Sequence, residues 1–207
     1  MDWQAKLGGF YPILDVEDRK LADDLLSAAT VLQIRFKSAP RGDLLRIATW
    51  ARRLTAERGA LLVVNDDLEV ALSAGADAVH LGQEDMPLAE ARERAGGALR
   101  IGISTHTLEQ VARAVAGGAD YLGFGPIYPT GSKANPDPVV GVERLAAAVR
   151  AAAPVPVVAI GGVTPERAPE LAAAGAHAAC AISAVNQVAD VRAAARAIAA
   201  AFARQRE

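Results

Sequence analysis

Residues 65–87 read NDDLEVALSAGADAVHLGQEDMP, and this stretch places two acidic side chains just after two consecutive apolar runs. Asp66 follows the run ALLVV at residues 60–64, and Asp85 follows the run AVHL at residues 78–81. One short helical pattern separates the runs, so the stretch predicts a strand, a helix and a second, parallel strand. Neighbouring strands lie ~4.8 Å apart, and the two carboxylates are therefore expected to converge on one cation. Mg²⁺ commonly binds to one or two carboxylates, with substrate phosphate oxygens completing its coordination.

The same two acids have a second interpretation as helix caps. Asp66 and Asp85 each precede a helical pattern, and Asp is a favoured N-cap residue. The stretch alone leaves both interpretations open, so the choice depends on where the other polar groups of the chain fall.

Composition narrows the class of protein. The 207 residues suffice for one domain and lie near the lower end for an eightfold α/β barrel. A net charge of −2 gives no basic surface for nucleic acid, and no apolar run approaches the ~20 residues that span a membrane. Cys180 is the only cysteine, which excludes an intrachain disulfide, and its apolar setting HAACAI predicts an inert core thiol. The cytoplasm is the expected compartment.

A short motif recurs along the chain and predicts the fold. The sequence AGAD at residues 74–77 returns as GGAD at 117–120 and as AGAH at 174–177, each time between a helical pattern and a short apolar run. Such an echo indicates repeated helix-to-strand joints. Eight strands alternating with eight helices are expected, forming one (β/α)₈ TIM barrel domain over residues 1–207, with residues 1–10 as a short N-terminal lead. A doubly wound open sheet is the competing architecture, but no G-x-G-x-x-G follows the first expected strand.

The second expected strand, TVLQIRFK at residues 30–37, has an unusual polar face. Side chains alternate between the two faces of a strand, so Gln33, Arg35 and Lys37 share one face, which would point into the barrel. Two cations there need an anionic partner, because an unpaired buried charge is costly. That partner is either an acid of the barrel itself or a bound diphosphate, for which an Arg fork and a Lys point charge are suited.

Polar residues also follow the later strands. The fifth expected strand, residues 99–103, is followed by Ser104, Thr105, His106 and Thr107. Ser104 or Thr107 would cap the next helix or face a ligand, whereas His106 is interpreted as incidental.

The loop after the sixth expected strand is the longest in the chain. It reads GPIYPTGSKANPDP at residues 125–138, and it is either a solvated loop or a phosphate cradle formed by Thr130, Ser132 and Lys133. Gly162 and Ser183 follow the seventh and eighth expected strands, whose loops commonly bind phosphate in such barrels. These groups fall at the carboxyl ends of successive strands, and this shared location favours an active site over isolated caps.

Five motifs together resemble the thiamine-phosphate synthase family, also called thiamine-phosphate pyrophosphorylase. They are QIRFK, the opening stretch NDDLEVALSAGADAVHLGQEDMP, GISTHT, GFGPIYPTGSK and AIGGVT, and the resemblance covers about residues 30–186. It implies a barrel enzyme that couples hydroxymethylpyrimidine diphosphate to thiazole phosphate, giving thiamine phosphate and pyrophosphate. The implied mechanism is dissociative: pyrophosphate leaves, a methylene cation forms on the pyrimidine, and the thiazole nitrogen captures it.

The resemblance also implies a role for each matching residue. Asp66 and Asp85 would ligate Mg²⁺, and catalytic roles would fall to Lys133, Ser104 and Arg35. The substrate-binding residues would be Gln33, Arg35, Lys37, Asn65, Ser104, Thr130, Ser132, Lys133, Gly162, Ile182 and Ser183. The expected partners are the two small-molecule substrates, without nucleic acid or membrane, and a homo-oligomer stays an open alternative.

Two other functions are weighed against the synthase. A thiazole tautomerase-like isomerase of the same superfamily would need a histidine in the loop after the sixth strand, near Gly125, where this sequence has none. A non-catalytic regulatory barrel would keep the phosphate sites without turnover.

Overall fold

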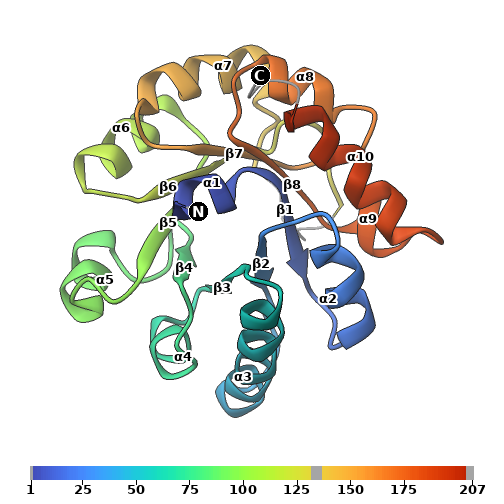
Figure 1. The fold of residues 1–207 in the computed structure, drawn as a ribbon. Coiled ribbons are helices and arrows are strands. Elements are labelled where there is room, and N and C mark those ends of the chain that lie inside the picture. The colour runs from blue at the N-terminus through green and yellow to red at the C-terminus, as the bar shows by residue number, and fades with distance from the viewer. Residues whose placement is uncertain (1, 132–136, 204–207) are drawn as a thin grey trace.

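A computed structural model describes residues 2–131 and 137–203. Within these residues, eight parallel strands close into a barrel in which β1 pairs with both β2 and β8 (Figure 1). The predicted single-domain (β/α)₈ barrel is confirmed, and the open doubly wound sheet is excluded. The strands are β1 (Gly9–Leu14), β2 (Val31–Ile34), β3 (Leu61–Asn65), β4 (Ala78–Leu81), β5 (Arg100–Thr105), β6 (Tyr121–Phe124), β7 (Val157–Ile160) and β8 (Ala178–Ala181).

Helices form a ring outside the strands (Figure 1). Those between consecutive strands are α2 (Arg19–Leu26), α3 (Arg41–Glu57), α4 (Leu68–Ser73), α5 (Leu88–Ala95), α6 (Leu108–Ala116), α7 (Gly141–Ala152) and α8 (Ala168–Ala173). After β8 come α9 (Ser183–Asn186) and α10 (Val191–Ala203). A further short helix, α1 (Trp3–Leu7), precedes β1 and places Leu7 in the apolar cluster inside the barrel. Among the described residues, none of these helices has both the length and the apolar character to cross a membrane.

Two apolar layers flank the strands, because both faces of each strand are covered. In β1, Phe10 and Leu14 join the large cluster between the barrel and the helices, whereas Tyr11 and Ile13 point into the barrel. The same alternation in β2 buries the polar side chain of Gln33, which is 2% exposed. The barrel interior therefore contains polar groups beside its apolar residues, and these groups need hydrogen-bond partners.

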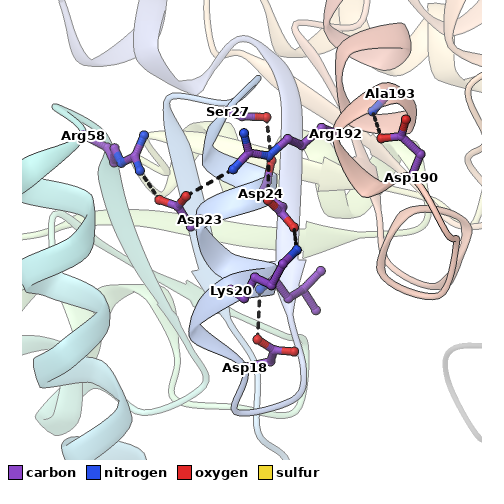
Figure 2. A network of polar contacts seen from close by, with 10 residues as sticks. Asp18, Lys20, Asp23, Asp24, Ser27, Arg58, Asp190, Arg192 and Ala193 are labelled. Carbon is purple, nitrogen blue, oxygen red and sulfur yellow. Dashed lines mark hydrogen bonds and ion pairs between the residues drawn. The ribbon is translucent and has the colours of Figure 1, made fainter.

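The ends of the helical ring are joined by ion pairs between α2 and α10, drawn in Figure 2. The buried Asp24 carboxylate on α2 accepts from Lys20 Nζ and from Arg192 Nε, each at 2.6 Å. Its neighbour Asp23 contacts Arg192 on α10 and Arg58 after α3. Hydrogen bonds from Lys20 and Arg192 hold the pKa of Asp24 below its ordinary value.

The structure differs from the sequence expectations at several element ends. The second strand ends at Ile34, so Arg35 and Lys37 lie in the loop after it rather than within it. Ser104 lies inside β5, which extends to Thr105, and the cap of α6 is Thr107. The N-terminal lead contains α1, and β1 already begins at Gly9.

Candidate active site

The two acids of the opening stretch lie at the carboxyl ends of two paired strands. Asp66 directly follows β3, where its N–H donates to the carbonyl of His80 on β4 at 2.9 Å. Asp85 lies in the tight loop after β4, and its Oδ2 accepts from Gly82 N–H at 2.6 Å. Among the described residues, Asp66 is the only non-glycine residue with a positive φ, at 67°. The backbone accepts an uncommon conformation to hold this carboxylate in place.

The charges around Asp66 show that the two carboxylates are close neighbours. Burial raises its pKa, and the Asp85 carboxylate raises it further, to about 6. Lys37 Nζ lies 3.5 Å from Asp66 Oδ2 and opposes that shift, although the lysine side chain is 54% exposed. A partly buried carboxylate with a second carboxylate beside it forms a site that a cation stabilises. The bond from Gly82 N–H uses Oδ2 of Asp85.

The alternative interpretation of these acids as helix caps is wrong. The cap of α4 is Asp67, whose side chain accepts from Val70 N–H at 3.0 Å. The residue before α5 is Pro87, which offers no side-chain acceptor. Asp66 and Asp85 are therefore not held in place by capping either helix.

The three polar residues predicted to share one face of the second strand lie at different depths in the structure. Gln33 points into the barrel, where its Nε2 donates to Asn65 Oδ1 at 3.4 Å. Arg35 is half-buried in the loop after β2, with its N–H donating to Leu14 O at 2.9 Å, and Lys37 reaches the acid pair. An internal acid thus does partner Lys37, which was one of the two alternatives for the row.

Ser104 joins the site from β5. Its Oγ lies 2.9 Å from His80 Nε2, and its carbonyl accepts from Gln83 Nε2 at 2.6 Å. Burial lowers the pKa of His80 to about 4, which keeps the ring neutral at ordinary pH. Sequence reasoning missed His80, although its position gave a signal: it is the one polar residue in the strand AVHL.

The loops after β6 and β7 pack tightly against one another. Gly162, at φ 63°, has no room for a side chain, since a Cβ there would lie 2.5 Å from Pro129 O and 2.8 Å from Tyr128 Cβ. Arg167 Nη1 donates to Gly162 O at 2.6 Å, and its guanidinium carbon lies 4.3 Å from the centre of the Tyr128 ring. Tyr128 OH in turn donates to Glu170 Oε2 at 2.6 Å. Arg167, Tyr128 and Glu170 were not predicted, because their roles depend on contacts between separate loops.

The structure describes some, but not all, of the remaining residues predicted to bind phosphate. Ile182 and Ser183 follow β8, and Gly162 follows β7, so they lie at the carboxyl ends of adjacent paired strands. Thr130 lies in the loop after β6, whereas Ser132 and Lys133 fall outside the described residues. The proposed cradle of Thr130, Ser132 and Lys133 therefore stays a prediction.

His106 is better connected than its interpretation as incidental suggests. Its Nδ1 lies 2.5 Å from Gly125 O, and its Nε2 lies 3.4 Å from Asp137 Oδ2. The fold thus brings an imidazole from the loop after β5 to Gly125, where the sequence of the sixth loop offers none. This ring connects the loops after β5 and β6, and both of its nitrogens have partners.

Cys180 on β8 is buried inside the barrel, as its apolar setting predicted. Burial raises the pKa of its thiol, so it is a poor nucleophile.

Comparison with known proteins agrees with this geometry. A family model described as thiamine monophosphate synthase matches residues 11–185. The thiamine-phosphate synthase of Moorella thermoacetica is 43% identical over 192 residues, covering 93% of this chain and 89% of the relative. That of Methanocella arvoryzae is 48% identical over 172 residues, covering 83% of this chain and 81% of the relative.

A solved structure supports the same assignment. The thiamine phosphate pyrophosphorylase from Pyrococcus furiosus superposes with a TM-score of 0.89 at 37% identity, covering 98% of both chains. The chain therefore belongs to the thiamine monophosphate synthase family and is an enzyme of the transferase class.

Proposed function

We propose that this chain is a Mg²⁺-dependent thiamine-phosphate synthase that joins hydroxymethylpyrimidine diphosphate to thiazole phosphate. The observation that carries the proposal is the pair of carboxylates, Asp66 and Asp85, after the paired strands β3 and β4, with Lys37 3.5 Å from Asp66. They lie at the same barrel face as the glycine loop after β7. The relatives are named thiamine-phosphate synthases, which supports thiamine phosphate as the product. The exposed Lys37 and half-buried Arg35 supply cations for a diphosphate next to the acid pair.

The Asp66 and Asp85 carboxylates would hold the metal ion. Bound there, Mg²⁺ would supply charge neutralisation for the diphosphate as it becomes a leaving group. The donor set fits this ion, since Mg²⁺ is typically held by one or two carboxylates while water and substrate phosphate fill the other positions. Lys37, 3.5 Å from Asp66, would bind diphosphate oxygens as well as the acid.

The reaction then follows from positioning and charge. The bond between the pyrimidine methylene carbon and the diphosphate oxygen breaks, and its electron pair leaves with pyrophosphate. The thiazole nitrogen donates its lone pair to the methylene cation, forming the new carbon–nitrogen bond. Gln33, Asn65 and Ser104 would orient the pyrimidine ring, while Gly162 and the Ser183 region would hold the thiazole phosphate. Lys133 and Arg35 would stabilise the departing pyrophosphate, so that no general base is required.

The test is pyrophosphate release by the purified protein supplied with both substrates. Release that requires both substrates and Mg²⁺, and that stops on addition of a chelator, supports the proposal. A folded protein that converts a thiazole phosphate tautomer without releasing pyrophosphate would be an isomerase. One that binds phosphorylated ligands without turning them over would be a regulatory barrel.

A further inference from the structure

A chain of hydrogen bonds crosses the barrel interior and ends at two residues of the candidate active site. Tyr11 OH donates to Gln33 Oε1 at 2.9 Å, and it lies 2.9 Å from Tyr121 OH. Tyr121 OH lies 3.0 Å from His80 Nδ1, and His80 Nε2 lies 2.9 Å from Ser104 Oγ. Tyr11, Tyr121 and His80 thus connect Gln33 with Ser104 without a gap.

The number of protons along this chain determines which atom donates in each hydrogen bond, once Tyr11 donates to Gln33. Tyr11 has a single hydroxyl proton, and that proton is used in the bond to Gln33 Oε1. The contact between the two tyrosines must therefore use the proton of Tyr121. Tyr121 then has no proton left for the imidazole, so His80 Nδ1 must carry the hydrogen that joins them. A neutral imidazole protonated at Nδ1 accepts at Nε2, and Ser104 must donate its proton there.

The surroundings keep every member of the chain neutral and in place. Tyr11 and Tyr121 are 2% and 1% exposed, and burial raises the pKa of both phenols. The Tyr121 ring fills the space over Gly102, where an added Cβ would lie 2.1 Å from the ring. The centres of the His80 and Tyr121 rings are 5.4 Å apart. Packing therefore fixes the rings at the separations that the hydrogen bonds need.

We propose that Tyr11, Tyr121 and His80 are positioning residues that hold the Ser104 hydroxyl proton in the bond to His80 Nε2. Ser104 Oγ would then face the substrate as an acceptor only. Ser104 would then recognise an N–H donor, and the exocyclic amino group of the pyrimidine is such a donor. The assignment of this substrate rests on the proposed function.

The other end of the chain has the opposite polarity. Gln33 uses its carbonyl oxygen to accept from Tyr11, and its amide nitrogen donates toward Asn65. The Gln33 end thus has one further N–H donor, which suits a ring nitrogen. An aminopyrimidine carries an N–H donor beside a ring-nitrogen acceptor, so its polarity would suit the two ends of the chain.

The direct test is the tautomer of His80, read by nitrogen-15 NMR of the imidazoles. The chain contains only three histidines, His80, His106 and His177, so variants His106→Gln and His177→Gln assign the signals. We expect His80 to be protonated at Nδ1 and bare at Nε2 in the substrate-free protein. A proton on Nε2, or a doubly protonated ring near neutral pH, would overturn the proposal. This measurement does not depend on turnover, so it stands apart from any failure of the proposed function.

The kinetic test uses Tyr121→Phe, which removes the acceptor for His80 Nδ1. Wild-type turnover first establishes the substrates. The variant should raise the KM for the pyrimidine diphosphate about tenfold, the scale of one lost hydrogen bond, while the KM for the thiazole phosphate stays within about twofold. The matched control is Thr105→Val on β5, which loses a buried hydroxyl bond to Gly123 O on β6. Strand alternation puts Thr105 on the same side of β5 as Ile101 and Ile103, which face the helices. The control should lose about as much thermal stability as Tyr121→Phe, while both of its KM values stay unchanged.

The polarity itself is tested with a pyrimidine diphosphate in which hydrogen replaces the amino group. Wild type should prefer the amino compound, and Ser104→Ala should lose most of that preference. Equal rises in both KM values for Tyr121→Phe, or an unchanged preference in Ser104→Ala, would reduce the chain to a structural element of the barrel and refute its role in recognition.

Discussion

Two groups of aspartates lie on the same barrel and have opposite charge environments. Asp24, with Asp23 beside it, lies between α2 and α10, where Lys20 and Arg192 supply cations at 2.6 Å. Asp66 lies next to Asp85, and its lysine partner is both farther away, at 3.5 Å, and largely exposed. Cations lower the pKa of Asp24, whereas burial and a second carboxylate raise that of Asp66 to about 6.

The difference is the one expected between a structural role for Asp24 and the proposed functional role of Asp66. At Asp24 the protein supplies its own countercharge, and the result joins the first barrel helix to the last (Figure 2). At Asp66 the described residues leave negative charge only partly compensated, and the backbone there has a φ of 67°. An arrangement that costs energy in the free protein is typical of a site completed by a ligand.

Removing one carboxylate of the Asp66 pair should have the largest effect. Asp66→Asn or Asp85→Asn keeps the side-chain size but removes a charge that the proposed metal ion would need. We expect a loss of at least about 100-fold in kcat, since even residues that only support metal ligands cost 10- to 100-fold. Steady-state pyrophosphate release measures the loss, and circular dichroism checks that the barrel remains folded.

The matched control for this pair is Asp67→Asn. Asp67 is the adjacent residue, and the amide oxygen of asparagine can still accept from Val70 N–H at the start of α4. Its activity should stay close to that of the wild type. Near-normal activity in Asp66→Asn and Asp85→Asn as well would contradict the metal assignment.

The two groups should also respond oppositely to pH in the metal-free protein. The pKa of Asp66 is raised in the fold, so the folded state holds a proton that the unfolded chain releases, and stability falls as pH rises from about 4 through about 6. The lowered pKa of Asp24 stabilises the fold above its ordinary value of 3.8 and loses that contribution as pH falls further.

The effect of Mg²⁺ on the Tm at two pH values tests whether the ion binds at Asp66. The ion should raise the Tm at pH 7.5, where Asp66 is ionised, and much less at pH 5, where a proton competes for the same oxygen. In Asp66→Asn the Mg²⁺ effect should be lost at both pH values. Equal stabilisation of wild type and variant would place the ion elsewhere on the protein.

Disrupting the Asp24 group should change stability and leave catalysis intact. Asp24→Asn keeps one acceptor oxygen but removes the charge that Lys20 and Arg192 share. We expect the Tm to fall by a few degrees with kcat and both KM values unchanged, as judged by thermal melts and pyrophosphate release. A loss of activity larger than the loss of folded protein would break the distinction between the two groups.

Much of this contrast was predictable, because the fold is encoded in local patterns. The apolar runs before Asp66 and Asp85 predicted two paired strands, and the recurring AGAD motif predicted a closed barrel, as the structure confirms. The convergence of the two acids followed from the geometry of parallel strands alone. Their identity as metal ligands stays a prediction.

The rest depends on contacts between residues far apart in the sequence. Nothing local distinguishes Asp24 from an ordinary surface aspartate, because its partner Arg192 lies 168 positions away. The same holds for His106 and the Gly125 carbonyl, which only the packed loops bring together. His80 was within reach, since a polar residue in an apolar strand implies a partner inside the barrel.

The smallest effect should come from Lys20, and it refines the account of the Asp24 group. The Lys20 side chain is 85% exposed and contacts Asp24 four positions along the same helix, whereas Arg192 reaches Asp24 from α10 and also contacts Asp23. Exposed ion pairs within a helix contribute little, since solvent screens them and ordering the side chain costs entropy. Lys20→Ala should therefore leave the Tm within about one degree, while Arg192→Ala should approach the loss seen in Asp24→Asn. Equal effects of the two substitutions would mean that Asp24 needs any positive charge nearby, rather than a connection between the first and last helices of the barrel.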